Sequence, residues 1–407
     1  DRRSRAARTL TPAAARTLTD HLNLDIAVIG GGIQGAGVAQ AAAAAGYSVA
    51  LIEKTGWAAG TSGKSSKLIH GGLRYLAGGH LHLVRESLRE RATLLRIAPH
   101  LVHSERFHIP LYRQSRLRSW QLAVGLALYA ALAGGGRHCG FSRLRKCRWT
   151  TLAGLRTDGL RSVWRYWDAR TDDVALTRAV VRSAASLGAR LWCPAEVINA
   201  ERTASGYRLR LQTTTGEQQL ACRVLVNCAG PWINQVAGRI APTPPGVAVD
   251  LVQGTHLVLT EPVVDHCYYL EAPADGRAVF LLPWQGGSLL GTTETLFTGD
   301  PDAVAPLPEE EAYLLAVLRH YFPAATPVVS ARMAGLRVLP RASDRPFQRS
   351  REVQLITDDR RAPRYVAVYG GKLTGYRATA AKVLRLLAPE LGPRVVRAGD
   401  TANLRLP

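Results

Sequence analysis

Blocks of apolar and small residues near the start of the chain predict a strand, a helix and a second strand. Leu24 to Ile29 is a short apolar run rich in branched residues, which is typical of a buried strand. Val38 to Ala45 is almost entirely alanine and favours a helix. Ser48 to Ile52 resembles the first run and predicts another buried strand. This order is a β-α-β unit, which implies parallel strands in a sheet that helices cover.

Further apolar runs predict elements along the rest of the chain. The proline-rich stretch from Ala241 to Gly246 indicates a passage from one domain to another. A helix is expected over Leu373–Leu387. Strands are expected at Arg223–Asn227, His256–Thr260, Val279–Leu282, Ser288–Gly291 and Tyr365–Val368.

One apolar segment has two interpretations. The longest uncharged stretch runs from Ser119 to Gly136, and its apolar part is Leu122 to Ala133. This part is shorter than the ~20 residues that a membrane-spanning helix needs. It is predicted to be a core helix or a helix that lies in a membrane surface. The basic residues that flank it would suit anionic lipid: Arg113, Arg116, Arg118, Arg137, Arg143 and Arg145.

Composition adds size and charge to this pattern. The 407 residues are 47% hydrophobic, which is enough for a large core and for two or three domains. Lys and Arg number 52 against 31 acidic residues, which gives a formal charge of +21. This surplus either favours an anionic partner, such as a phosphorylated substrate or acidic lipid, or is simply solvated. The sequence has no recognised nucleic-acid module, so nucleic acid is not an expected partner.

The chain start and the cysteines are less informative. Residues 1–21 are interpreted as a basic N-terminal extension, because they carry five arginines and no apolar core of a secretory signal. The six cysteines contain no C-x-x-C pair, so we expect reduced, buried thiols and no metal site. They are Cys139, Cys147, Cys193, Cys222, Cys228 and Cys267.

A glycine-rich turn between the first strand and the first helix predicts a dinucleotide site. Gly30 would allow the tight turn, Gly32 would let the backbone approach a pyrophosphate, and Gly35 would let helix and strand pack closely. The helix N-terminus would then face the phosphates. Glu53 ends the second strand, where a carboxylate can accept hydrogen bonds from ribose hydroxyls. An acid at this point argues against a 2′-phosphate and leaves FAD or NAD.

A longer pattern follows Glu53. The run Thr61 to Leu76 reads TSGKSSKLIHGGLRYL, and Gly370 to Arg377 reads GGKLTGYR. Between them lie NCAGPW at Asn227 to Trp232 and GTTE at Gly291 to Glu294. In order and spacing these segments resemble the signatures of the FAD-dependent, quinone-linked glycerol-3-phosphate dehydrogenases, over roughly residues 24 to 405.

This resemblance implies an α/β fold in which a Rossmann-like FAD-binding domain carries an inserted antiparallel-sheet substrate domain, or cap. The FAD-binding domain is expected over residues 22–78, 172–243 and 335–390, and the cap over residues 79–171 and 244–334. Residues 391–407 would start a C-terminal region that is otherwise absent. The resemblance also implies FAD as cofactor, a membrane quinone as electron acceptor and oxidation of glycerol 3-phosphate to dihydroxyacetone phosphate. A cytoplasmic protein bound peripherally to the inner membrane, and a homodimer, are further expectations.

The resemblance also implies site residues. The substrate pocket is expected to contain Arg74, Tyr75, His256, Arg337, Lys372 and Arg377. The expected cofactor-binding residues are Gly30, Gly31, Gly32, Gln34, Gly35, Glu53, Lys54, Thr61, Ser62, Ser65, Ser66, Lys67, Ala229, Gly230, Trp232, Gly371, Lys372, Leu373 and Thr374.

Alcohol oxidation assigns roles to some of these residues. An imidazole suits removal of the hydroxyl proton, so His256 and His70 are the candidate bases, with His256 preferred. Arg74 and Arg337 would bind the substrate phosphate, with Arg377 as a further candidate, because a guanidinium can hold two oxygens at once. Lys372, ahead of a helix expected to start near Leu373, would stabilise negative charge that develops on the reduced flavin.

The chain departs from the family pattern at four positions. Ala41 and Ala45 replace an Asp and an Arg of the first helix, Glu294 replaces an Asp, and Val338 replaces a Pro. Two alternative functions also stay open, because the dinucleotide motif does not separate dehydrogenases from oxidases and the charge of +21 would suit nucleic acid. One is a flavin oxidase that acts on an amine or 2-hydroxy acid with O₂ as acceptor, and the other is a basic flavoprotein that binds nucleic acid.

Overall fold

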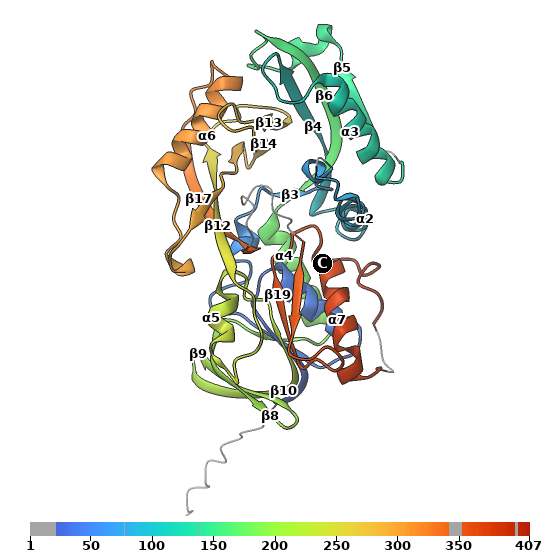
Figure 1. The fold of residues 1–407 in the computed structure, drawn as a ribbon, viewed down its shortest axis with the longest axis vertical. Coiled ribbons are helices and arrows are strands. Elements are labelled where there is room, and N and C mark those ends of the chain that lie inside the picture. Colours follow the sequence, from blue (N-terminus) through green and yellow to red (C-terminus); the bar gives the residue numbers. More distant parts are fainter. Residues whose placement is uncertain (1–21, 77, 137, 342–351, 395–397) are drawn as a thin grey trace, which may run out of the picture.

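The chain forms two stacked halves, each built on one sheet. A computed structural model describes residues 22–76, 78–136, 138–341, 352–394 and 398–407, apart from the side chains of Leu22 and Arg74. In Figure 1 the lower half contains sheet A, and the upper half contains sheet B. The chain passes between the halves several times, so neither is one continuous segment.

Sheet A has a parallel centre, as the β-α-β pattern predicts. β1 (Leu22–Ile29) pairs in parallel with β2 (Val49–Ile52) and with the long strand β10 (Gly216–Asn227). The other strands are β7 (Arg190–Trp192), β8 (Ala195–Thr203), β9 (Gly206–Thr213), β11 (Ile240–Ala241), β18 (Gln354–Thr357) and β19 (Tyr365–Tyr369). β7 and β19 extend the parallel centre, whereas β8 and β9 form an antiparallel flap beside β10.

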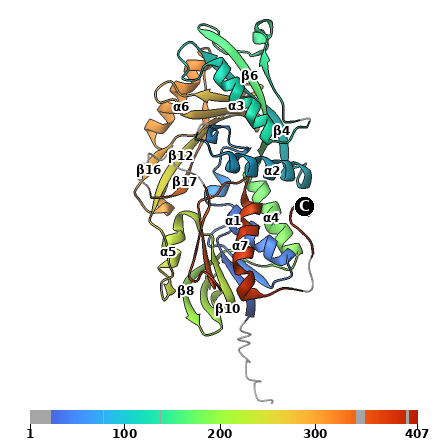
Figure 2. The same ribbon diagram turned by 45° about the vertical axis from the view of Figure 1, so that its right-hand side comes forward.

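Three helices cover one face of sheet A. α1 (Ile33–Ala44), α4 (Asp173–Ser186) and α7 (Tyr376–Leu391) lie side by side in Figure 2, and their small and apolar residues share one core with the sheet. The alanines of α1 are buried, which lets the neighbouring helices approach closely. A second core on the other face includes α5 (Ile233–Ala237). The lower half is therefore a three-layer Rossmann-like unit.

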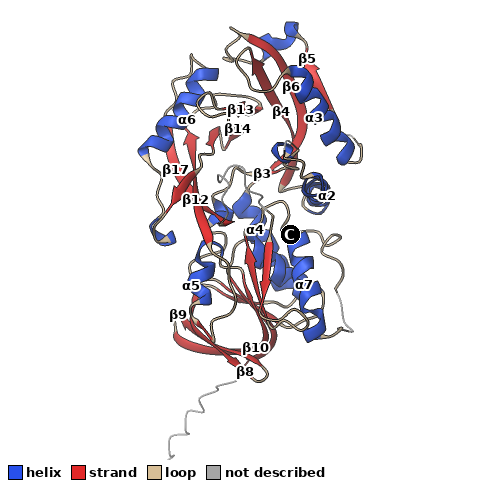
Figure 3. Ribbon diagram, in the orientation of Figure 1, coloured by secondary structure: helices blue, strands red, loops and turns tan. Residues whose placement is uncertain are grey.

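Sheet B is largely antiparallel (Figure 3). Its strands are β3 (Leu68–Ile69), β4 (Val102–Tyr112), β5 (Phe141–Leu144), β6 (Leu160–Thr171), β12 (Val249–Leu259), β13 (Cys267–Glu271), β14 (Ala278–Trp284), β15 (Gly287–Gly291), β16 (Thr295–Phe297) and β17 (Val329–Pro340). The helices α3 (Ser119–Leu132) and α6 (Pro308–Tyr321) pack on it, and α2 (Leu81–Ile97) lies between the halves. The expected α/β fold class with an antiparallel-sheet cap is confirmed.

Two long strands belong to both halves. β12 pairs with β17 from Val249 opposite Pro340 to Leu259 opposite Val329. Val249 packs against the core beneath sheet A, whereas Leu259 is in the core of the upper half. Strand β17 thus crosses the expected domain boundary at residue 335, and β3, which was expected in the FAD-binding segment 22–78, pairs with β6 in sheet B.

Each predicted strand overlaps an observed strand, but β10 and β12 each begin seven residues before the predicted starts at Arg223 and His256. The helix predicted from Leu373 begins instead at Tyr376, because residues 372–375 form a turn in which the Gly375 N–H donates to the Lys372 carbonyl (3.2 Å). Cys147 is exposed, contrary to the expectation of buried thiols. Within the described ranges, no helix combines the length and apolarity needed to cross a membrane.

Candidate active site

A cavity of about 520 Å³ lies where the carboxyl ends of the parallel strands of sheet A meet sheet B. This edge is where open α/β sheets bind their ligands. Predicted site residues from both halves line it. They are Gly30, Gly32, Gln34, Glu53, Lys54, Thr61, Ser62, Ser65, Ser66, His70, Ala229, Gly230, Trp232, His256, Arg337, Gly371, Lys372, Leu373 and Thr374.

The glycine turn is shaped by close backbone contacts. Gly30 has φ +109°, and a Cβ added there would lie 2.4 Å from the carbonyl oxygen of Cys228. A Cβ at Gly35 would lie 1.9 Å from the carbonyl oxygen of Gly30. Neither position therefore accommodates a side chain. The turn ends at the N-terminus of α1, where the Ile33 N–H donates to Ser62 Oγ at 2.9 Å.

Glu53 is oriented by backbone groups at the end of β2. Its Oε2 accepts the Gly31 N–H at 2.7 Å, and its Oε1 accepts the N–H of Thr55 at 2.8 Å. Gly31 itself does not line the cavity, so its part is to hold this carboxylate. Glu53 lines the cavity, as the predicted ribose-binding role requires.

The wall of the cavity fits a polar ligand. Gln34 Oε1, Trp232 Nε1 and His256 Nδ1 are buried and have no hydrogen-bond partner among the described residues. Buried polar groups are normally paired, so three unpaired groups on residues that line the same cavity indicate a site that a ligand completes. Together with the glycine turn and Glu53, this wall fits a dinucleotide.

Arg337 extends from β17 into the sheet B side of the cavity. Its Nη2 donates to Thr292 Oγ1 at 3.0 Å, and its Nη1 donates to the Thr293 carbonyl at 3.3 Å. Glu294 Oε1 lies 3.6 Å from Nη1 and forms an ion pair with it. One short segment, Thr292 to Glu294, therefore makes three contacts that fix the guanidinium.

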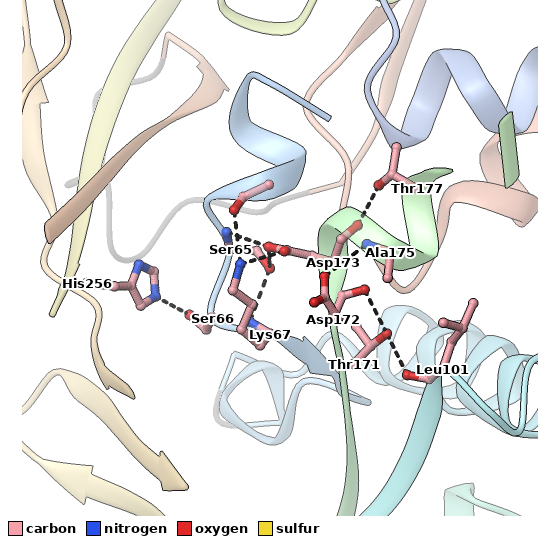
Figure 4. A network of polar contacts seen from close by, with 11 residues as sticks. Ser65, Ser66, Lys67, Leu101, Thr171, Asp172, Asp173, Ala175, Thr177 and His256 are labelled. Atoms are coloured by element: carbon pink, nitrogen blue, oxygen red, sulfur yellow. Dashed lines mark hydrogen bonds and ion pairs between the residues drawn. The ribbon is translucent and has the colours of Figure 1, made fainter. Parts of the chain in front are cut away.

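His256 lies on β12, the strand that pairs with the strand carrying Arg337. Its side chain is 2% exposed, and Nε2 lies 2.9 Å from Ser66 Oγ, as Figure 4 shows. Burial, followed by the positive charges of Arg337 and Lys67, lowers the pKa of His256 to about 3. The imidazole is therefore uncharged at neutral pH and can act as a proton acceptor.

The model of the family described as FAD dependent oxidoreductase matches residues 25–382 of this chain. This chain belongs to the FAD-dependent oxidoreductases. FAD is accordingly the cofactor of this chain, as the resemblance implied.

Within this family, the chain belongs with the glycerol-3-phosphate dehydrogenases. It is 36% identical to glycerol-3-phosphate dehydrogenase of Pseudomonas aeruginosa over 91% of this chain and 73% of that protein. It is 34% identical to D-erythritol 1-phosphate dehydrogenase of Brucella abortus over 90% of this chain and 75% of that protein. The crystal structure of glycerol-3-phosphate dehydrogenase from Bacillus halodurans complexed with FAD is similar, with a TM-score of 0.73 at 26% identity, over 94% of this chain and 68% of that one.

Lys67, an expected FAD-binding residue, faces away from the cavity of this FAD-dependent oxidoreductase. Its ammonium lies 2.5 Å from Asp173 Oδ1, and Ser65 Oγ donates to Oδ2 of the same carboxylate at 2.7 Å (Figure 4). Lys67 also has φ 59°, a backbone conformation that non-glycine residues rarely adopt. The buried ion pair holds this conformation, so Lys67 shapes the loop that carries Ser66.

Two expected substrate residues lie outside the cavity. Arg377 on α7 donates to Glu90 of α2 from Nη2 at 2.6 Å and from Nε at 3.0 Å, and so links two helices. Tyr75 is buried, and the Lys372 ammonium lies 4.0 Å from its ring centroid. Lys372 itself lines the cavity. The side chain of Arg74 lies outside the described part of the structure.

Sequence reasoning missed Arg277 on the cavity wall. Its Nε donates to Asp275 at 2.7 Å, and its Nη1 donates to the Glu294 carbonyl at 2.8 Å. It lies just before the predicted strand Val279–Leu282, which was a usable signal, because functional side chains often lie at strand ends.

Proposed function

We propose that this protein oxidises sn-glycerol 3-phosphate to dihydroxyacetone phosphate. Two observations support the assignment: the names of its relatives and an arginine-bearing wall that faces the dinucleotide side of the same cavity. The observation that carries it is Arg337, a fixed guanidinium beside a buried neutral imidazole.

The roles follow from the side-chain chemistry. Arg337 binds the substrate phosphate, for which its forked donor group is suited. His256 accepts the hydroxyl proton on its imidazole, which the hydrogen bond between Nε2 and Ser66 Oγ at 2.9 Å orients. FAD, when bound, supplies the acceptor for the hydride of the carbinol carbon. Lys372 places positive charge on the cavity wall, where it would favour the anionic reduced state of the bound flavin.

The low pKa of His256 is consistent with this role once the substrate charge is included. Arg337 is one of the charges that lower it. A phosphate dianion held by Arg337 would offset that charge and raise the pKa of the imidazole. Substrate binding would thereby make His256 a stronger base.

Anaerobic mixing with glycerol 3-phosphate tests the proposal. We expect the flavin absorbance of the holoenzyme to bleach, and D-erythritol 1-phosphate and glycine serve as comparison substrates. Bleaching by glycine and not by glycerol 3-phosphate would overturn the assignment in favour of an amine oxidase. Reoxidation by a quinone analogue, without peroxide, is expected to exceed reoxidation by O₂.

We further propose that the protein passes its electrons to a membrane quinone while bound to the cytoplasmic face of the inner membrane. The α3 surface supports this. Leu122, Leu126 and Tyr129 face the core, whereas an outer stripe of apolar side chains is 40–64% exposed: Leu117, Trp120, Val124 and Leu128. Exposed basic residues lie beside it in the sequence: Arg113, Arg116, Arg118, Arg143 and Arg145. An apolar stripe with basic neighbours suits an anionic bilayer surface.

Flotation with vesicles that contain phosphatidylglycerol tests this surface. Replacing Trp120 and Val124 by serine is expected to reduce vesicle binding about tenfold, because the stripe loses most of the apolar area that it would bury in the bilayer. Leu296 and Val328, exposed apolar residues outside α3, provide a matched double-serine control. Equal flotation of the two double variants would defeat the proposal. The homodimer stays a prediction, which light scattering of the holoenzyme would test.

A further inference from the structure

Glu310 is a buried carboxylate that the proposed reaction does not use. It lies in the first turn of α6 and is 3% exposed. No lysine or arginine among the described residues forms an ion pair with it. Its hydrogen-bond donors are instead Thr255 Oγ1 (2.6 Å), Gln253 Nε2 (2.7 Å), Thr293 Oγ1 (2.7 Å), Thr295 Oγ1 (2.8 Å) and the Leu307 N–H (3.2 Å).

These contacts favour the charged form of Glu310. Burial opposes ionisation, but the hydrogen bonds from Thr255, Thr293, Thr295 and Gln253 outweigh it and lower the pKa of Glu310. A charged carboxylate accepts several strong hydrogen bonds at once, which a neutral side chain of the same size cannot do. It therefore serves as a fixed point for its donors.

Three of the donors come from β12, which carries His256, and from the segment that contacts Arg337. Thr255 precedes His256 on β12. Thr293 lies between Thr292 and Glu294, in the segment that makes three contacts with Arg337. The two segments are also joined directly, because the Thr255 N–H donates to Thr293 Oγ1 at 2.8 Å.

We propose that Glu310 is a positioning residue that sets the placement of Arg337 relative to His256. The inference rests on the proposed function for the roles of these two side chains. Glu310 touches neither of them, and it acts through the hydroxyl of Thr293 and the hydroxyl of Thr255. It provides a fixed anchor behind the substrate end of the cavity.

The experiment uses the FAD-bound enzyme and the variants Glu310→Gln and Glu309→Gln. Glu309 is the exposed neighbour in the same first turn, so its replacement controls for the lost charge at the helix N-terminus. For Glu310→Gln we expect the KM for glycerol 3-phosphate to rise about tenfold and kcat to fall about threefold, while the flavin content is unchanged. The Glu309→Gln variant is expected to stay within about twofold of the parent protein.

Inorganic phosphate gives a readout that needs no turnover. Its dissociation constant, measured by the change in flavin absorbance, is expected to rise about tenfold in Glu310→Gln, but little in an Arg337→Lys background. Such non-additivity shows that two residues act through one another. A lower melting temperature with unchanged phosphate affinity and unchanged KM would overturn the proposal, because it would mean that Glu310 only stabilises the fold.

Two further results keep the outcomes separate. If Glu310→Gln does not fold, Thr255→Val removes one donor with little change in volume, and unchanged phosphate affinity in that variant would overturn the proposal. If the parent enzyme does not bleach with glycerol 3-phosphate, the proposed function fails, but the phosphate measurements still decide whether Glu310 positions Arg337.

Discussion

The two ends of the cavity are built in different ways. At the sheet A end, the shape is set by backbone: Gly30 and Gly35 leave no room for a Cβ, and Glu53 is held by amide groups. At the sheet B end, the shape is set by side chains, since Arg337 and His256 contact Glu294 and Ser66, which lie in loops between strands. The sheet A end needs glycines, which have no side chain. The sheet B end needs charged and polar side chains that are held by buried hydrogen bonds and ion pairs.

This difference has an energetic consequence. A side chain added to the glycine turn meets backbone atoms, which can move little. A side chain changed at the sheet B end removes an ion pair or a hydrogen bond from its partner. The loops that carry Ser66 and Glu294 can adjust to such a change. We therefore expect all-or-none effects at the first end and graded effects at the second.

The largest effect is expected from Gly30→Ala. The new Cβ would lie 2.4 Å from the Cys228 carbonyl at φ +109°, so the turn must move and FAD affinity should fall by about ten-thousandfold or more, roughly 5.5 kcal/mol. The ratio of flavin to protein absorbance measures this. Gly140→Ala is the control, because a Cβ there meets nothing within 4 Å. A yellow, active Gly30→Ala protein would contradict the backbone description.

Arg337→Ala should have the next largest effect. We expect kcat/KM for glycerol 3-phosphate to fall about a thousandfold, or ~4 kcal/mol, because the phosphate loses its fixed cation, while flavin stays bound. Steady-state kinetics with a quinone dye measure this. Arg332→Ala, on the same strand, removes a surface ion pair with Glu311 and should have little effect. Unchanged turnover in Arg337→Ala would refute the phosphate role.

Arg377→Ala separates a structural arginine from a substrate-binding one. The variant leaves Glu90, which is 4% exposed, without its partner, so the free energy of unfolding should fall by about 3 kcal/mol. The KM should stay constant, since Arg377 does not line the cavity. Lys382→Ala is the control, because its ion pair with Glu86 joins the same helices but is more exposed. A raised KM with unchanged stability would restore Arg377 to the substrate site.

The smallest effect concerns pH. Burial lowers the pKa of His256 to about 3 and that of His108 to about 4. Above about pH 6.5 both imidazoles are neutral in the folded and the unfolded chain. Below it, only the unfolded chain takes up the protons, so stability is lost as the pH falls towards 4, by up to ~1.4 kcal/mol per pH unit for each histidine. Urea unfolding of His256→Asn between pH 7 and 5 should show a shallower loss, unlike the exposed control His100→Asn.

The sequence was most informative where local backbone requirements decide the structure. The β-α-β unit, its glycine turn and Glu53 lie close together in the chain, and their geometry follows from strand, turn and helix rules. It was least informative about which distant acid a cation would meet. Arg337 and Arg377 both lie in the last part of the chain. Arg337 pairs with Glu294, whereas Arg377 pairs with Glu90, 287 residues away.

The same limit explains Lys67 and Arg277. Lys67 lies within a motif expected to bind FAD, yet its ammonium is taken by Asp173, 106 residues further along. Arg277 belongs to no recognised motif. It lines the cavity because it lies directly before β14, which pairs with β15. Long-range pairing of charges depends on the packed fold, which no local pattern contains.

The ribbon of β12 and β17 has a mechanical consequence. Its lower end is embedded in one hydrophobic core and its upper end in the other, so it acts as a stiff beam between them. A large rotation of the upper half would have to bend the two paired strands or pull their ends out of the two hydrophobic cores. Entry of substrate and exit of product should therefore depend on small, local loop movements around the cavity mouth, with the two halves remaining in a fixed relation.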